Sequence, residues 1–134
     1  AYQTTPDGSL LSTAHDLHQW NLALYKSKII NTSFLEKMLS PHIPIILPRA
    51  IAVANNKLSI HYGYGIACVF DPRTNTTFYR HGGLSGGFRT ELVYCPENEV
   101  SVVVLSNATW SDQKEDPMRD MRKLAQDLLN ITQS

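Results

Sequence analysis

The chain has 134 residues, of which 43% are hydrophobic and 18% charged, so length and composition predict one globular domain covering residues 1–134. Its 12 basic and 12 acidic residues cancel, and no run of Lys and Arg occurs, which argues against nucleic acid or an anionic membrane surface as a partner. No apolar run approaches the roughly 18–20 residues of a transmembrane helix, so no membrane segment is expected in this chain.

Two helices are predicted near the N-terminus. In STAHDLHQWNLALYK, Ser12 or Thr13 is placed to cap a helix that runs to about residue 25, with apolar residues at steps of mostly three and four. A second helix is expected from Thr32 or Ser33 to Leu39, where Pro41 stops it. The following segment, 41–60, is apolar but contains three prolines, so we expect it to wrap the domain without regular structure.

Residues 62–107 predict an antiparallel meander of about four strands. The expected strands are YGYGIACVF, NTTFYRHG, FRTELVYC and VSVVVLSN, separated by turns and by a glycine-rich connection. The last strand is apolar on both faces and is expected in the interior of the sheet, covered on both sides. A final amphipathic helix is predicted over 117–131, which gives an α+β fold with N- and C-terminal helices packed on an antiparallel sheet.

Several polar residues have a simple structural interpretation. Arg89 and Glu91 alternate on one strand face, where they either line a substrate or form an exposed pair, and the exposed pair is favoured. Cys68 and Cys95 both fall in predicted strands, and two buried free thiols are favoured over a bridge. The histidine pair on the first helix lacks further ligands at a defined spacing, so no metal and no cofactor are expected.

The stretch YRHGGLSGGF concentrates four of the seven glycines within six positions beside His81. Glycine has no Cβ to block a ligand, and unpaired backbone N–H groups can donate to a developing oxyanion. The alternative is a glycine-rich bulge between two strands with His81 on the surface. These residues alone favour the bulge.

Three separated stretches favour the ligand-binding interpretation over the bulge. GSLLSTAHDLHQWNLAL, YGYGIACVF and HGGLSGGFRTELVYCPENEVSVVVLSN resemble, in order, the C-terminal region of the serine β-lactamase-like family of β-lactamases, D-Ala-D-Ala peptidases and esterases. The resemblance covers nearly the whole chain and implies a partial β-lactamase/transpeptidase-like fold. It also implies that the natural protein is periplasmic or secreted, although the N-terminal residues lack the pattern of a signal peptide.

The resemblance assigns roles to the glycine-rich stretch. His81 stands where the family has the Lys or His of its third motif, and Gly83 stands at the motif's glycine, beside which substrate lies. The backbone N–H of Leu84 then supplies half of an oxyanion hole. Gly82, Ser85 and Arg89 are the further positions expected to bind substrate. Because histidine is only partly charged near neutral pH and Gly82 has no hydroxyl, an uncharged ester or peptide is expected rather than a penicillin-type carboxylate.

The family's other catalytic motifs are missing. The chain has no Tyr-x-Asn, and its one Ser-x-x-Lys, from Ser111 to Lys114, follows the glycine-rich motif in an acidic segment that would keep the lysine protonated. The chain alone is therefore expected to be inactive, as the C-terminal part of a serine hydrolase that acts on small acyl, ester or peptide substrates. The exposed sheet edge of such a part is expected to promote self-association. The alternative is a binding or scaffold module that keeps the architecture without the chemistry.

Overall fold

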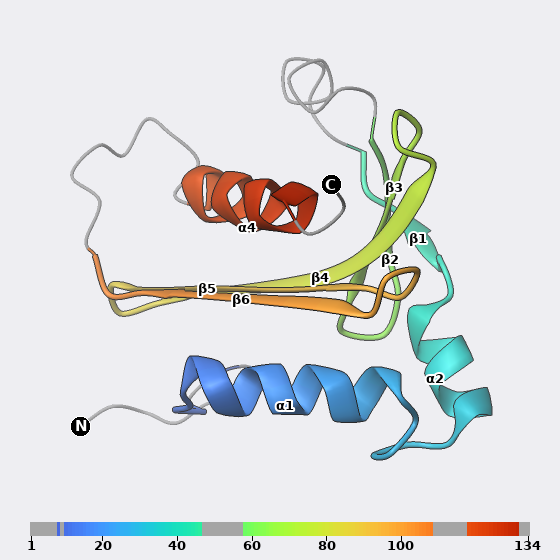
Figure 1. Ribbon diagram of the computed structural model, residues 1–134, viewed down its shortest axis with the longest axis horizontal. Helices are drawn as coiled ribbons and strands as arrows, with labels where there is room; N and C mark the ends of the chain where they lie inside the picture. The colour runs from blue at the N-terminus through green and yellow to red at the C-terminus, as the bar shows by residue number, and fades with distance from the viewer. Residues whose placement is uncertain (1–7, 9, 47–57, 109–117, 132–134) are drawn as a thin grey trace.

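The computed structural model describes residues 8, 10–46, 58–108 and 118–131, and it has an antiparallel sheet of six strands in the order β1-β2-β3-β4-β5-β6. Helix α1 (Ala14–Tyr25) lies on one face of the sheet and helix α4 (Arg119–Ile131) on the other, while α2 (Thr32–Leu39) lies beside the β1–β2 end (Figure 1). The predicted α+β class is confirmed. Among the described residues, no helix is long and apolar enough to cross a membrane.

The helices begin and end close to the predicted positions because their signals are local. Thr13 caps α1, its hydroxyl accepting a hydrogen bond from the backbone N–H of Asp16 at 3.1 Å. Asn31 caps α2 in the same way, accepting from the N–H of Phe34 at 3.0 Å. The C-terminal helix starts at Arg119, two residues after the predicted start.

The sheet has two more strands than the sequence predicted. The strands are β1 (Ile43–Pro44), β2 (Ser59–Tyr62), β3 (Ala67–Asp71), β4 (Thr76–Ser85), β5 (Phe88–Cys95) and β6 (Val100–Ser106). β1 and the first two residues of β2 fall within the proline-rich segment, 41–60, that was expected to lack regular structure. β1 is an edge strand, where Pro44 does not disrupt an interior ladder.

The predicted first strand is instead a hairpin. Residues 63–66 form a turn in which the N–H of Gly63 donates to the carbonyl of Ile66 at 2.8 Å, and β2 and β3 pair on either side of it. The glycine-rich stretch likewise differs from expectation, because β4 continues through Gly82 and Gly83 as regular strand. The connection to β5 is reduced to Gly86 and Gly87, with φ of 54° and 87°, as a two-residue hairpin of this type requires.

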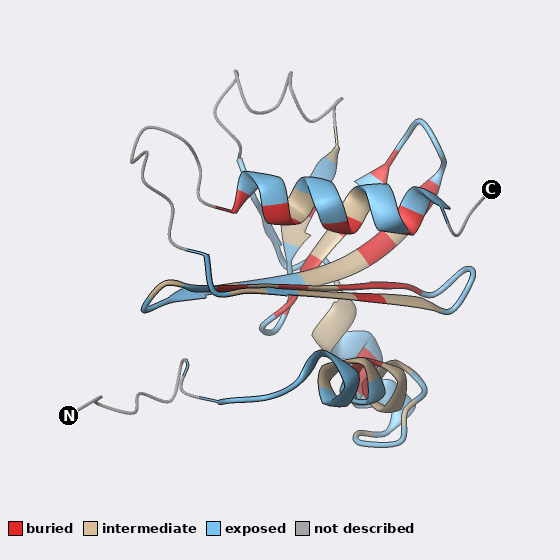
Figure 2. Cartoon of the chain, turned by 60° about the vertical axis from the view of Figure 1, so that its left-hand side comes forward, coloured by how far each residue is buried: buried red, intermediate tan, exposed pale blue. Residues whose placement is uncertain are grey.

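The main core lies between the sheet and α4. Val69, Phe78 and Cys95 from the strands meet Ala125 and Leu129 of the helix, and these side chains are almost fully buried. Figure 2 shows buried positions along α4 and along the strands that it covers. β6 contacts both α1 and α4, which confirms that both of its faces are covered. However, β6 is the last strand of the six rather than an interior one.

Two polar side chains of β5 are buried, contrary to the favoured prediction of an exposed pair. Arg89 is 5% exposed and Glu91 is 2% exposed. Both point to the same face of the sheet, as their alternation predicts, but α4 covers that face. Both cysteines are free, as predicted, but only Cys95 is buried. Cys68 is partly exposed, because it neighbours the core residue Val69 and so points to the opposite face.

Candidate functional site

The glycine-rich part of β4 has an open edge. β3 pairs with β4 only as far as Ala67 opposite Arg80, whereas β5 continues to pair with β4 up to Ser85. Residues 81–85 are therefore hydrogen-bonded to a strand on one side, and no strand from the described ranges pairs with their other side. Such an edge offers backbone donors and acceptors to a bound ligand.

The hairpin register indicates which backbone groups face this open edge. Ser85 and Phe88 flank a two-residue turn, where the flanking pair exchanges its hydrogen bonds. Hydrogen-bonded pairs alternate along an antiparallel ladder, so Gly83 and His81 also direct their backbone groups to β5. The N–H and C=O groups of Gly82 and Leu84 consequently point to the open edge.

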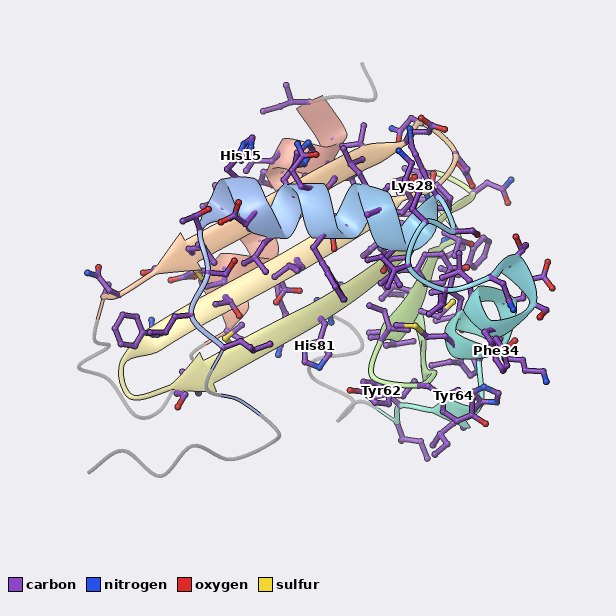
Figure 3. All side chains as sticks on the ribbon, turned by 90° about the horizontal axis from the view of Figure 1, so that it is seen from below. His15, Lys28, Phe34, Tyr62, Tyr64 and His81 are labelled. Carbon is purple, nitrogen blue, oxygen red and sulfur yellow. The ribbon has the colours of Figure 1, made fainter. Side chains whose placement is uncertain are left out.

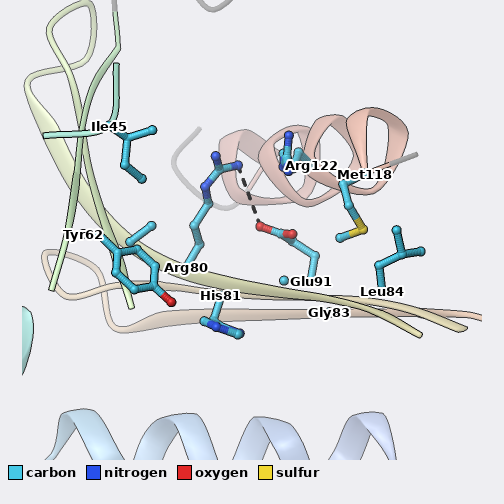
Figure 4. Close-up of a pocket in the computed structure, with 11 residues that line it drawn as sticks. Ile45, Tyr62, Arg80, His81, Gly83, Leu84, Glu91, Met118 and Arg122 are labelled. Atoms are coloured by element: carbon cyan, nitrogen blue, oxygen red, sulfur yellow. Dashed lines mark ion pairs between the residues drawn. The ribbon is translucent and has the colours of Figure 1, made fainter. Parts of the chain in front are cut away.

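Side chains on this strand alternate between the two faces of the sheet. His81 projects toward the side of α1, as seen from below in Figure 3 and from the side in Figure 4. A Cβ added to Gly82 would point the other way, 3.0 Å from Cε of Met118 and 2.6 Å from Oε2 of Glu91. Gly82 is thus required by the buried carboxylate on the neighbouring strand, a reason that the sequence did not show.

A cavity of about 270 Å³ lies on the α4 side of this strand, which we call the α4-side cavity (Figure 4). Arg80 extends from β4 toward α4 in this cavity and forms an ion pair with Glu91, with 3.8 Å between Nη1 and Oε1. The cavity therefore combines an open strand edge, an ion pair whose carboxylate is buried, and apolar side chains. Its lining residues are Ile45, Tyr62, Ala67, Arg80, His81, Gly82, Gly83, Leu84, Glu91, Met118 and Arg122.

A second cavity, of about 390 Å³, lies on the opposite face and is called the α1-side cavity. His81 borders both cavities. The lining of this one is otherwise mainly apolar: Trp20, Asn21, Leu24, Tyr25, Ile29, Ile30, Met38, Gly65, Ile66, His81 and Leu92. Tyr25 stacks on both Tyr79 and Tyr94, with ring centroids 5.8 and 4.1 Å away. Burial raises the pKa of the Tyr25 hydroxyl above its ordinary value.

The structure brings together most of the residues that the sequence singled out. His81, Gly82, Gly83 and Leu84 all line the α4-side cavity, and Ser85 is exposed at the end of the same strand. Arg89 is buried and lines neither cavity. Ser111 and Lys114 lie outside the described residues.

Sequence reasoning missed the other walls of the α4-side cavity. Arg80 directly precedes the histidine and carried no separate signal, while Tyr62 was read only as the start of a strand. Arg122 belongs to the polar side of an amphipathic helix, which is ordinarily exposed. These residues become neighbours only when the sheet bends and α4 packs across it, so no local pattern could have found them.

The sequence matches one protein-family model, and the fold is similar to solved structures. Residues 1–127 match the family model described as Beta-lactamase. No curated protein sequence matches the chain significantly. Among solved structures, a penicillin binding protein from Bacillus halodurans is similar with a TM-score of 0.58 and 23% identity, over 84% of this chain and 30% of that one. A D-amino acid amidase from Ochrobactrum anthropi SV3, complexed with D-phenylalanine, gives a TM-score of 0.56 and 19% identity, over 76% of this chain and 31% of that one. The chain thus spans less than a third of either protein.

Proposed function

Because the chain belongs to the β-lactamase family, we propose that it forms one wall of a serine acyl-transfer site. In this proposal the Ser-x-x-Lys and Tyr-x-Asn motifs lie elsewhere in the natural protein, and this chain has no hydrolytic activity alone. The observation that carries the proposal is the open edge of β4 at Gly82 and Leu84, directly beside His81.

The open edge has the chemistry that acyl transfer requires. The backbone N–H of Leu84 is fixed by the hairpin and donates to the oxyanion that forms when a serine attacks the substrate carbonyl. An extended substrate pairs with the same edge as an added strand, and the absence of a side chain at Gly82 and Gly83 leaves the edge accessible. His81 presents an imidazole at the boundary of the two cavities, where it donates to or accepts from the reacting group.

The α1-side cavity provides a surface for the region that carries the nucleophile. Its apolar side chains remain accessible, with Trp20 51% and Ile29 42% exposed. A helical region that covers them would bury this apolar area and would bring its own residues next to His81. The cavity therefore supports a site formed between the sheet and a second, helical part of the protein.

The outer edge of β6 supports the same interpretation. Arg122 lines the α4-side cavity over β4, so that side of α4 faces β4. Leu124, Leu128 and Ile131 lie on the other side of the helix, above the outer edge of β6, and are 48%, 39% and 70% exposed. We infer that a further strand of the natural protein pairs with β6 beneath this apolar stripe, and that the chain alone self-associates there.

The substrate proposed for the site is an uncharged ester or peptide. The position that has a hydroxyl in the Lys-Thr-Gly form of the motif is Gly82 here, and Glu91 leaves no room for a side chain. The carboxylate of a penicillin-type substrate therefore has no hydroxyl donor from the protein at this position.

Covalent labelling tests the proposal. This chain and the natural protein that contains it would each be incubated with a fluorescent penicillin and with an activated fluorophosphonate, then analysed by intact mass. We expect no adduct on the chain alone and one adduct on a serine outside it in the natural protein. His81→Ala should slow the fluorophosphonate reaction at least about tenfold, since positioned acid–base groups typically contribute more than that.

His15→Ala is the matched control, because His15 is an exposed histidine on α1, away from both cavities. A stoichiometric adduct on the chain alone, mapped to Ser85 or Ser111, would overturn the proposal. No adduct on the natural protein would favour the scaffold alternative instead.

A further inference from the structure

An apolar wall closes one end of the α4-side cavity. Ile45 and Tyr62 line it, 38% and 36% exposed, and Ile43 pairs with Tyr62 in the β1–β2 ladder with 64% of its surface exposed. Paired residues of neighbouring strands point to the same face of a sheet, so the three side chains form one surface. Partly exposed apolar residues on the wall of a cavity are available to a ligand.

This wall is fixed in place before any ligand binds. The sheet bends so that β1 and β2 rise beside α4, opposite its Met118 end (Figure 1). The turn after Tyr62 is held against α2, where the N–H of Tyr64 donates to the carbonyl of Met38 at 3.0 Å. Gly63 lies so close to the same carbonyl that no larger residue fits. A preformed wall costs a ligand little ordering entropy.

We propose that Ile43, Ile45 and Tyr62 form a specificity subsite for an uncharged apolar group of the substrate, either an aryl ring or a branched alkyl chain. This inference rests on the proposed function, because it places the substrate carbonyl at the N–H of Leu84. The cavity, at about 270 Å³, is slightly smaller than the pockets that hold a whole drug-sized ligand, so it takes one substituent rather than the entire substrate.

Three charged side chains line the α4-side cavity, Arg80, Glu91 and Arg122, and all three lie to one side of the apolar wall, so the wall itself presents no charge to a substituent (Figure 4). Arg80 extends from β4 toward α4 between the wall and Glu91, and its guanidinium forms an ion pair with that carboxylate (Figure 4). Tyr62 presents its ring to the cavity, with the hydroxyl directed toward the His81 side (Figure 4). The ring contributes apolar contact area, and the hydroxyl can remain hydrated.

Substrate preference tests the subsite in the natural protein that contains this chain. The measurement is the ratio of kcat/KM for the p-nitrophenyl esters of phenylacetate and acetate. Tyr62→Ala should lower the preference for the phenylacetyl ester about tenfold or more, the scale of apolar discrimination in enzyme pockets. Tyr62→Phe keeps the ring and should retain the preference, as should Phe34→Ala, which removes an exposed aromatic ring from α2.

A binding measurement separates the subsite from the chemistry. Phenylacetamide, with acetamide as the matched small probe, would be titrated into the natural protein while isoleucine methyl signals are followed by NMR. Phenylacetamide, but not acetamide, should shift the methyl signals of Ile43 and Ile45. The methyl signals of Ile29, which lines the α1-side cavity, should not respond.

Each outcome decides one of the two proposals. Shifts at Ile45 without any ester hydrolysis by the wild-type protein would retain the subsite and reject the proposed function. Hydrolysis with the same preference in Tyr62→Ala and Tyr62→Phe would reject the subsite. Shifts at Ile29 in place of Ile45 would also reject it, because they would assign the apolar group to the other face of the sheet.

Discussion

Replacing Gly82 with alanine tests how tightly the candidate site is coupled to the buried ion pair beneath it. The new Cβ would lie 2.6 Å from Oε2 of Glu91, whereas ordinary van der Waals contact begins near 3.4 Å. The carboxylate must therefore move by roughly 0.8 Å. Glu91 is 2% exposed and paired with Arg80, so it cannot turn into solvent to make room.

The expected effect of Gly82→Ala is a loss of about 1–2 kcal/mol in the free energy of unfolding. Overpacking a buried site typically costs about 1–3 kcal/mol. Alanine offsets about 0.4–1 kcal/mol of this because it lowers the conformational entropy of the unfolded chain. Glu91→Ala removes the closest atom that the methyl group would meet and leaves Cε of Met118 at 3.0 Å and the carbonyl oxygen of Thr90 at 3.3 Å. In a double-mutant cycle the two substitutions should therefore couple by about 1 kcal/mol.

Urea unfolding followed by circular dichroism measures this loss as a midpoint lower by about 1 M. Gly83→Ala is the matched control. Its Cβ would meet only the side chain of Thr90, with Oγ1 at 2.6 Å, and that hydroxyl can rotate away. We expect a clearly smaller loss there. Equal losses at the two glycines, or no coupling between Gly82 and Glu91, would refute the reasoning.

Two pH-dependent effects are also expected. Burial raises the pKa of the Tyr25 hydroxyl, so the unfolded chain ionises first and stability should fall above about pH 10, by up to about 1.4 kcal/mol per pH unit. Tyr25→Phe should flatten this slope in urea titrations between about pH 9 and 11, and an unchanged slope would assign it to Tyr79 and Tyr94 instead. Hydrogen bonds from Arg73, at 2.8 and 3.2 Å, lower the pKa of the Asp71 carboxyl, so its contribution is present above about pH 4 and is lost as the pH falls further. Asp71→Asn should cost about 1 kcal/mol at pH 7 and little at pH 2, and an equal cost at both would contradict the assignment.

Local chemistry allowed much of the fold to be predicted from the sequence. Thr13 and Pro41 mark helix boundaries because capping and the missing N–H of proline act within one turn of the chain. The strand 88–95 was predicted with its observed bounds, since turn residues flank an alternating run. Three separated stretches also indicated the family because they follow one another in the family's order, and the match of the family model to residues 1–127 confirms that resemblance.

Tertiary packing decided what local patterns leave open. Alternation indicated that Arg89 and Glu91 share a face, but only the packing of α4 showed that this face is covered. The pairing of β1 with β2 joins segments separated by more than ten residues, and proline content argued against it. The apolar wall of the α4-side cavity depends on that pairing. The periodicity of a strand determines which of its side chains point to the same face. Elements distant in the sequence determine what covers that face. The walls of the cavity could therefore be identified only from the three-dimensional structure.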